Sequence, residues 1–311
     1  MLTKIYLIFL LFFKFHSLVS CNFIISNNCP YTIWPGTLAG AGTSQLLSTG
    51  FRLDPSHSAR LAAPLGWSGR IWGRTGCEFD GNGVGFCATG DCGGKLQCAG
   101  AGAAPPTTLF EITLGTGQQM DFYDVSLVDG YNLPLFAAPR VRYGTCNFTS
   151  CTTDLNSDCP KELQVVDVDE NGEGGVVACR SACDAFGLDQ YCCSGKFASP
   201  STCKPSNYSS IFKNACPNAY SYAFDDRTST FTCKAQEYII LFCPNYNRGK
   251  RSDDSSTVQP MHGEPSEVID NGEEPQEYDT GDGEEPPEMI SSSSIIDTSL
   301  FLILFLEALF Q

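Results

Sequence analysis

Four acidic side chains fall within the segment LFEITLGTGQQMDFYDVSLVDG, namely Glu111, Asp121, Asp124 and Asp129. The usual catalytic nucleophile sets need a histidine, and between residues 22 and 251 the only histidine is His57, in DPSHSAR. We interpret His57 as a surface residue and set Ser-His-Asp and Cys-His chemistry aside. Any chemistry of this region therefore falls to carboxylates.

Strands must position these acids. In LFEITL the apolar side chains at 110, 112 and 114 share one face, so Glu111 projects from the other. A regular strand places Asp124 and Asp129 on opposite faces. Both can line one cleft only if Asp129 lies past the strand end, which the turn-forming DGYNLP permits. The sequence leaves the two arrangements open.

Short β-branched or aromatic runs separated by Gly, Pro, Asn and Asp predict an all-β body. The runs are FIISNN, YTIW, RIWGR, TLFEITL, STFTC and EYIILFC. We expect one folded unit from Asn22 to Cys243.

The segment GVGFCATGDCGGKLQC, residues 83–98, raises the question of what its cysteines do. Zinc and redox sites favour closely spaced cysteine pairs, and no C-x-x-C occurs in the chain after residue 21. GDCGG also lacks the G-K-[ST] ending of a phosphate-binding loop. The spacing therefore predicts disulfides that hold a loop with almost no core of its own.

Two features limit the disulfide pairing. Adjacent Cys192 and Cys193 cannot easily join each other, so they belong to two bridges. Cys179 and Cys183 stand four residues apart in VVACRSACDAFG, which predicts one face of a short helix closed by Gly187. We expect them to reach separate partners as well.

The N-terminal end, residues 1–21, has the pattern of a secretory signal peptide, with Lys4 before an apolar run and small residues before Asn22. Cleavage there removes Cys21 and turns seventeen cysteines into an even number. That parity suits a secreted chain with paired thiols.

The C-terminal end differs in kind. Residues 245–290 are rich in Pro, Ser, Gly and acids and predict a disordered stalk. Residues 291–311 combine small residues with an apolar end and predict a glycosylphosphatidylinositol (GPI) attachment signal, with Ser292 as the candidate anchor residue. The alternatives are a propeptide or inert tail, or a membrane span, for which the apolar run is short.

The formal net charge of −16 belongs mostly to this tail, because fifteen of the 35 acidic residues lie after Arg251. No basic patch stands out, so nucleic acid is not an expected partner. Asn147 in NFT and Asn207 in NYS are predicted N-glycosylation acceptors.

The motifs resemble those of the thaumatin-like proteins, pathogenesis-related family 5. The resemblance rests on the cysteine-rich segment above and on segments that follow the family pattern in order over residues 22–244: NNCPYTIWPG, GRIWGRTGC, MDFYDVSLVDGYNLP, YCC, CPNAYSYAFDDRTSTFTC and LFCP. It implies an all-β flattened sandwich (22–74, 106–152 and 217–244), a small stapled loop (75–105) and a disulfide-rich helical lobe (153–216). It also implies eight bridges: Cys29–Cys243, Cys77–Cys87, Cys92–Cys98, Cys146–Cys233, Cys151–Cys216, Cys159–Cys179, Cys183–Cys192 and Cys193–Cys203.

The resemblance implies an acidic cleft lined by Arg70, Glu111, Asp124, Asp129 and Asp226, with no metal and no cofactor. One hypothesis is a binding groove in which carboxylates accept hydrogen bonds from the hydroxyls of a β-1,3-glucan and an aromatic such as Tyr123 stacks on the sugar. The second is a weak endo-β-1,3-glucanase in which Glu111 protonates the leaving oxygen and Asp129 acts as base or nucleophile. The third is an Arg70-centred charge network that only fixes the sheet. Disruption of fungal membranes ranks below these three, because no amphipathic helix or basic face is evident.

The combined prediction is a secreted, monomeric plant-defence or cell-wall protein of the apoplast, held at the plasma membrane by the lipid anchor. It is expected to bind wall polysaccharide, with antifungal action or a role as a surface sensor or structural wall protein as further hypotheses.

Overall fold

A computed structural model describes residues 19–141, 144–168, 172 and 174–244. Residues 1–18 of the predicted signal peptide, the predicted stalk and the predicted anchor signal with Ser292 lie outside the described residues. Within the described ranges, no helix is long and apolar enough to cross a membrane.

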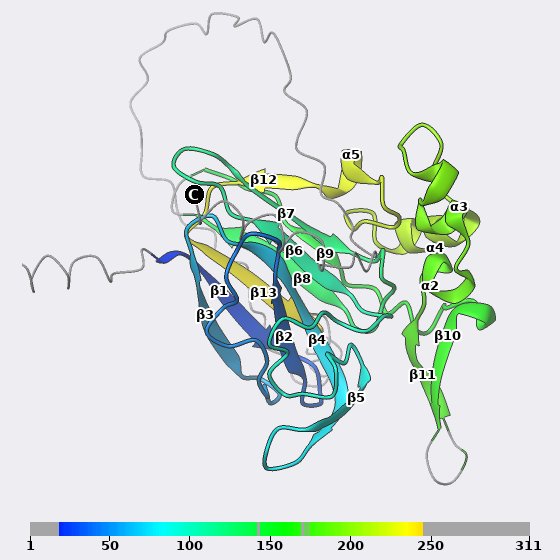
Figure 1. The fold of residues 1–311 in the computed structure, drawn as a ribbon, viewed down its shortest axis with the longest axis horizontal. Coiled ribbons are helices and arrows are strands. Elements are labelled where there is room, and N and C mark those ends of the chain that lie inside the picture. Colours follow the sequence, from blue (N-terminus) through cyan, green and yellow to red (C-terminus); the bar gives the residue numbers. More distant parts are fainter. Residues whose placement is uncertain (1–18, 142–143, 169–171, 173, 245–311) are drawn as a thin grey trace, which may run out of the picture. The chain divides into compact units, whose positions relative to one another are not determined.

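One sheet has five strands in the order β3-β1-β13-β8-β9. Their bounds are β1 Val19–Asn27, β3 Ser58–Pro64, β8 Leu135–Arg140, β9 Thr149–Cys151 and β13 Glu237–Phe242. β1 and β13 run parallel, although one begins and the other ends the domain. Figure 1 shows β13 (yellow) between β1 (blue) and β8 (green).

The second sheet is antiparallel and contains β12-β7-β6-β4-β2, with β5 paired to the far end of β4. Its strands are β2 Trp34–Ala39, β4 Ser68–Phe79, β5 Gly85–Thr89, β6 Leu109–Thr113, β7 Asp121–Ser126 and β12 Phe231–Cys233. All-β architecture with few helices confirms the predicted fold class.

The core lies between the two sheets, where alternate residues of each strand turn inward. Phe110 on β6 lies 6.4 Å from Phe23 on β1 and 6.3 Å from Tyr238 on β13, measured between ring centroids. These rings come from different sheets and are fully buried. The alternation predicted for LFEITL therefore sets which face of β6 packs and leaves Glu111 on the other.

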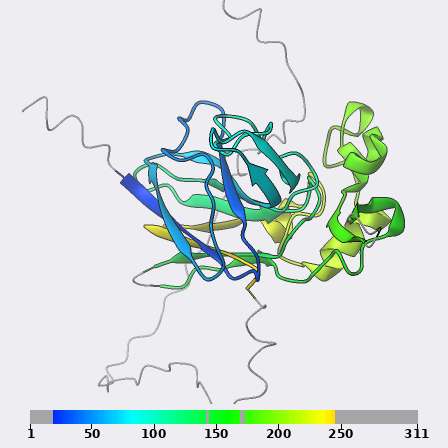
Figure 2. The same cartoon turned by 90° about the horizontal axis from the view of Figure 1, so that it is seen from below.

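A helical lobe lies between β9 and α5 in the chain. It contains β10 Gln164–Val168, β11 Gly174–Cys179, α2 Ala182–Phe186, α3 Asp189–Cys192 and α4 Asn207–Ala215, with short 3-10 turns η1 Lys161–Leu163 and η2 Gly195–Phe197. α5 Asp226–Ser229 follows, just before β12. Figures 1 and 2 both show α2, α3, α4 and the β10–β11 hairpin grouped outside the two sheets.

The helix predicted around Cys179 and Cys183 is correct only in its second half. Cys179 ends β11, and α2 begins at Ala182. Ser181 caps α2 by accepting a hydrogen bond from the Asp184 amide, and Gly187 ends it with φ of 63°. Cys179 is in a strand and not in a helix because the Cys179 backbone pairs with that of Tyr131 in the body of the protein.

Eight disulfides cross-link the described residues, and each is a pair that the resemblance implied. They join Cys29–Cys243, Cys77–Cys87, Cys92–Cys98, Cys146–Cys233, Cys151–Cys216, Cys159–Cys179, Cys183–Cys192 and Cys193–Cys203. Among the described cysteines Cys21, the last residue of the predicted signal peptide, is free and buried.

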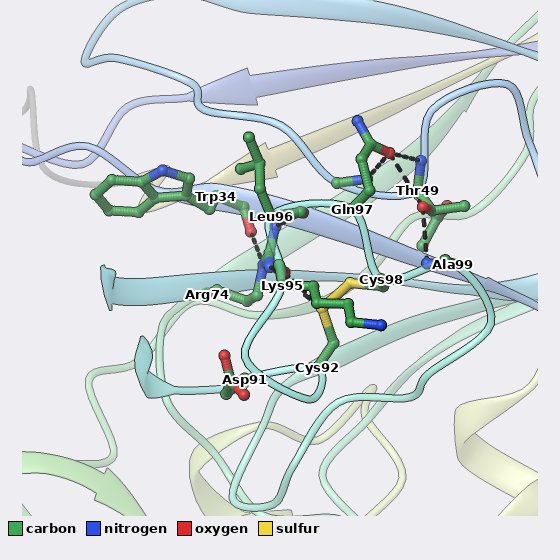
Figure 3. Close-up of a disulfide and its surroundings, with 12 residues drawn as sticks. Trp34, Thr49, Arg74, Asp91, Cys92, Lys95, Leu96, Gln97, Cys98 and Ala99 are labelled. Carbon is green, nitrogen blue, oxygen red and sulfur yellow. Dashed lines mark hydrogen bonds between the residues drawn. A yellow bond between two sulfur atoms is a disulfide. The ribbon is translucent and has the colours of Figure 1, made fainter. Parts of the chain in front are cut away.

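Arg74 on β4 forms hydrogen bonds with the backbone of the stapled loop. It is fully buried, and it donates hydrogen bonds to the carbonyl oxygens of Trp34 (2.9 Å), Lys95 (2.8 Å) and Leu96 (2.8 Å). Figure 3 shows these contacts beside the disulfide that Cys92 forms with Cys98. This guanidinium links residues 95 and 96 of the loop to β2 and β4, beside the disulfides Cys77–Cys87 and Cys92–Cys98 and the pairing of β5 with β4.

Candidate functional site

Three of the predicted site residues form a row across the second sheet. Arg70 on β4 lies opposite Glu111 on β6, and Glu111 lies opposite Asp124 on β7. Opposite residues in an antiparallel pair have Cβ atoms about 4.5–5.5 Å apart. The row occupies the outer face of the sheet, since Ile71 and Phe110 of the same strands point into the core.

Arg70 bridges two carboxylates in this row. Its Nη2 atom lies 3.0 Å from Oε1 of Glu111, and its Nη1 atom lies 3.8 Å from Oδ2 of Asp129. The side chains of Arg70, Glu111 and Asp129 are 28%, 23% and 36% exposed, respectively. All three are therefore open to a ligand while partly shielded from water.

Asp129 reaches this position from a turn, not from a strand. β7 ends at Ser126, and the Asp129 carbonyl accepts a hydrogen bond from the Thr107 amide at 3.0 Å. Gly130 follows with φ of 90°, where an added Cβ would lie 2.6 Å from Cβ of Pro106. Of the two arrangements that the sequence left open, the structure has Asp129 past the strand end.

Asp124 is the buried member of the row. It is 0% exposed, and neither of its carboxyl oxygens has a hydrogen-bond partner among the described residues. Burial raises its pKa well above the ordinary value, with repulsion from Glu111 next and from Asp226 as a smaller cause, while Arg70 opposes the shift. A ligand on this face meets the other carboxylates first.

Asp226 approaches the row from the first residue of α5 and is exposed. Its Oδ1 atom accepts a hydrogen bond of 2.7 Å from the buried Tyr220 hydroxyl, which also contacts the Thr230 hydroxyl. Burial raises the pKa of Tyr220, so the phenol stays a donor. Sequence reasoning missed Tyr220, because its position in a loop carries no periodic signal.

Burial likewise raises the pKa of Glu111 and of Asp129, and in both cases the Arg70 charge partly opposes the shift. Asp129 also raises the pKa of Glu111 by repulsion. We call Arg70, Glu111, Asp124, Asp129 and Asp226 the acidic cluster.

Two residues of the same segment lie on the wrong face for this cluster. Tyr123 is fully buried with its ring centroid 5.2 Å from that of Tyr238, so the prediction that it stacks on a sugar is wrong. Asp121 also faces inward. It accepts hydrogen bonds from the Gly115 amide, the Ala235 amide and the Tyr238 hydroxyl, and it pairs with Lys234.

A small hollow lies beside the turn that carries Asp129. Val128 and Tyr222 line it from the body, and Ser181, Tyr191 and Lys204 line it from the helical lobe. Its volume of about 20 Å³ has room for roughly one water molecule.

A model of the thaumatin family matches residues 27–244, which carry all five members of the acidic cluster. The chain belongs to the thaumatin family. Two relatives show how close other thaumatin-family members are. "Pathogenesis-related protein 5" of Arabidopsis thaliana is 52% identical over 244 residues, covering 78% of this chain and 99% of the relative. "Glucan endo-1,3-beta-glucosidase" of Prunus avium is 51% identical over 220 residues, covering 70% and 88%.

The thaumatin fold also resembles that of a laminaripentaose-producing β-1,3-glucanase solved with laminaritetraose. The TM-score is 0.50 at 12% identity, and the match covers 72% of this chain and 98% of the glucanase. At that identity the likeness concerns the fold alone.

Proposed function

We propose that this thaumatin-family protein binds a β-1,3-glucan at the acidic cluster. The observation that carries the proposal is that one guanidinium, Arg70, contacts two partly exposed carboxylates, Glu111 and Asp129. Carboxylates accept hydrogen bonds from sugar hydroxyls, and each such charged bond contributes about 1.5–3 kcal/mol. Asp226 adds a third exposed acceptor.

The alternative proposal is weak endo-β-1,3-glucanase activity. Two observations favour it: the name of the Prunus avium relative and the raised pKa of Glu111. A general acid must hold its proton near neutral pH, and burial beside other carboxylates moves a glutamate in that direction. Asp129 is then the base or nucleophile on the other side of Arg70.

Reducing-end release from a linear β-1,3-glucan by the purified protein, beside Glu111→Gln, tests both proposals. Glucan retention without release supports binding alone. Release that Glu111→Gln abolishes supports the glucanase with Glu111 as acid. Glu78→Gln is the matched control, because Glu78 is an exposed glutamate outside the acidic cluster. A protein that neither retains nor cleaves the glucan would overturn both proposals.

We also propose that the protein is secreted, glycosylated at Asn147 and Asn207, and held at the plasma membrane by a GPI anchor near Ser292. Both asparagines are exposed, and the hydroxyl residues of their motifs, Thr149 and Ser209, are buried. Such a protein would act in the apoplast as a defence or cell-wall component. Phosphatidylinositol-specific phospholipase C should release it from plant cells, and continued attachment would contradict the anchor.

A further inference from the structure

We infer that Asp124 is protonated at neutral pH and that its O–H donates a hydrogen bond to the ionised Glu111. The acidic cluster then holds one proton on its buried member, below the exposed carboxylates. This inference deepens the proposed function, because it assigns the charge state in which the cluster meets a sugar. Asp124 is thus a positioning residue that acts through Glu111.

The first step is the burial of Asp124. An ionised carboxylate that is closed to water and accepts no hydrogen bond costs several kcal/mol, and protonation removes that cost. Asp124 meets both conditions, since it is 0% exposed and both of its oxygens lack a partner among the described residues. A neutral acid then needs an acceptor for its own O–H.

The strand register supplies that acceptor. Glu111 lies directly opposite Asp124 on the neighbouring strand, with both side chains on the outer face of the sheet. Opposite residues of an antiparallel pair have Cβ atoms about 4.5–5.5 Å apart, and carboxyls on such neighbours share a proton in preference to ionising together. The Asp124 O–H can therefore donate to a Glu111 oxygen.

The proton resides on Asp124 because the two carboxyls have unequal surroundings. Arg70 lies 3.0 Å from Glu111, whereas the described residues include no cation within 4.0 Å of Asp124. Glu111 is also 23% exposed, so water can solvate its charge. Ionisation is consequently easier at Glu111.

The remaining charged and titratable neighbours agree with this assignment. They are Arg70 on β4, Glu111 on β6, Asp226 on α5 and Tyr220 in the loop before α5. Asp129, in the turn after β7, contacts Arg70 and repels Glu111. Arg70 is the one cation in this set, and Tyr220 is neutral. A second negative charge at Asp124 would add repulsion from both Glu111 and Asp226.

This arrangement has a consequence for the sugar site. At neutral pH Glu111 is an acceptor, as glucan binding requires. In the glucanase alternative the proton on Asp124 must first pass to Glu111, which then donates it to the leaving oxygen. Acidification protonates Glu111 as well and removes one charged hydrogen bond to the sugar. Glucan affinity should then fall about tenfold, the equivalent of roughly 1.4 kcal/mol.

The test is carboxyl ¹³C NMR on the full-length protein with labelled Asp and Glu, recorded without glucan from pH 5 to pH 8. We expect one carboxyl signal to keep its protonated shift at pH 7 and to disappear in Asp124→Asn. Asp226→Asn, which alters an exposed acid of the same cluster, should retain it. The inference is overturned if every carboxyl ionises below pH 6, or if the protonated signal survives in Asp124→Asn.

Two further measurements keep the inference separate from the proposed function. The spectra are recorded without glucan. A protein that does not bind glucan would therefore contradict the proposed function without affecting the assignment of the proton to Asp124. If Asp124→Asn does not fold, Glu111→Gln replaces it: the protonated signal should persist there, since the amide oxygen still accepts from Asp124. Loss of that signal in folded Glu111→Gln would assign the proton to Glu111 and overturn the inference.

Discussion

Arg70 and Glu111 lie opposite each other on β4 and β6, with Nη2 of the arginine 3.0 Å from Oε1 of the glutamate. The same guanidinium reaches Asp129 at 3.8 Å. Among the described residues, no other cation lies within 4.0 Å of either carboxylate. One arginine thus fixes both the geometry and the charge balance of the acidic cluster.

Replacing this arginine should weaken the site and the fold together. In Arg70→Met the two carboxylates lose their cation, and we expect a loss of about 1–2 kcal/mol, between the values for exposed and buried ion pairs. Urea denaturation measures it. Arg52→Met removes the arginine of an exposed pair with Asp54 and should change stability by less than about 0.5 kcal/mol. Equal effects of the two variants would contradict the role given to Arg70.

Stability should rise as the pH falls from 8 to 5. The pKa values of Glu111, Asp124 and Asp129 are raised in the folded state, so over this window the folded protein binds more protons than the unfolded chain. The gain accumulates as pH falls through the raised pKa values and is complete below the ordinary ones. Thermal unfolding midpoints at pH 5, 6.5 and 8 test this, and the slope should flatten in Asp124→Asn. A midpoint that rises towards pH 8 would show that the sign is wrong.

Arg74 should be essential to the stapled loop. Burial lowers its pKa to about 10, so it remains charged at neutral pH while its donors serve backbone carbonyls from two sides. Arg74→Met leaves these carbonyls unpaired and should cost about 3–5 kcal/mol. Arg74→Lys should rescue little, because one ammonium cannot span the same acceptors. Hydrogen exchange of residues 92–98 reports the loosening; unchanged exchange in both variants would refute it.

Asp121 should contribute to the stability of the fold and not to glucan affinity. It faces the core and accepts three hydrogen bonds besides its contact with Lys234. Asp121→Asn should lose about 2–4 kcal/mol on denaturation, since an amide cannot replace a carboxylate among so many donors. Glucan affinity of the folded fraction should equal that of the parent, because the acidic cluster is on the opposite face. A selective loss of affinity would place Asp121 in the site.

Local sequence patterns predicted the parts of the site that depend on strand alternation. The apolar side chains at 110, 112 and 114 point inward and Glu111 outward, as the period of two requires. The same rule would have placed Tyr123 on the face opposite Asp124, its immediate neighbour, and the error was to group them by proximity in the chain. Whether Asp129 shares a face with Asp124 stayed open, because the turn that carries Asp129 is fixed by its backbone hydrogen bond with Thr107, which is distant in sequence.

Burial that arises from distant segments could not be predicted in this way. In the sequence, Arg74 in GRTG resembles a surface arginine. In the fold, residues 95 and 96 lie against it and accept its hydrogen bonds. Asp124 likewise comes near Asp226 only in the folded chain, because Asp226 lies about a hundred residues further along the sequence. The cost of burying such groups becomes visible only once the fold brings those segments together.

The bridge between Cys29 and Cys243 gives the domain a mechanical property. It joins the residues just after β1 and just after β13, two parallel strands that are paired with each other. Tension applied between the chain segments beyond these two cysteines would pass through a covalent bond and bypass the residues enclosed between them. β1 precedes Cys29 and would itself carry the load, whereas residues 30–242 would carry none until a reductant cuts that single link.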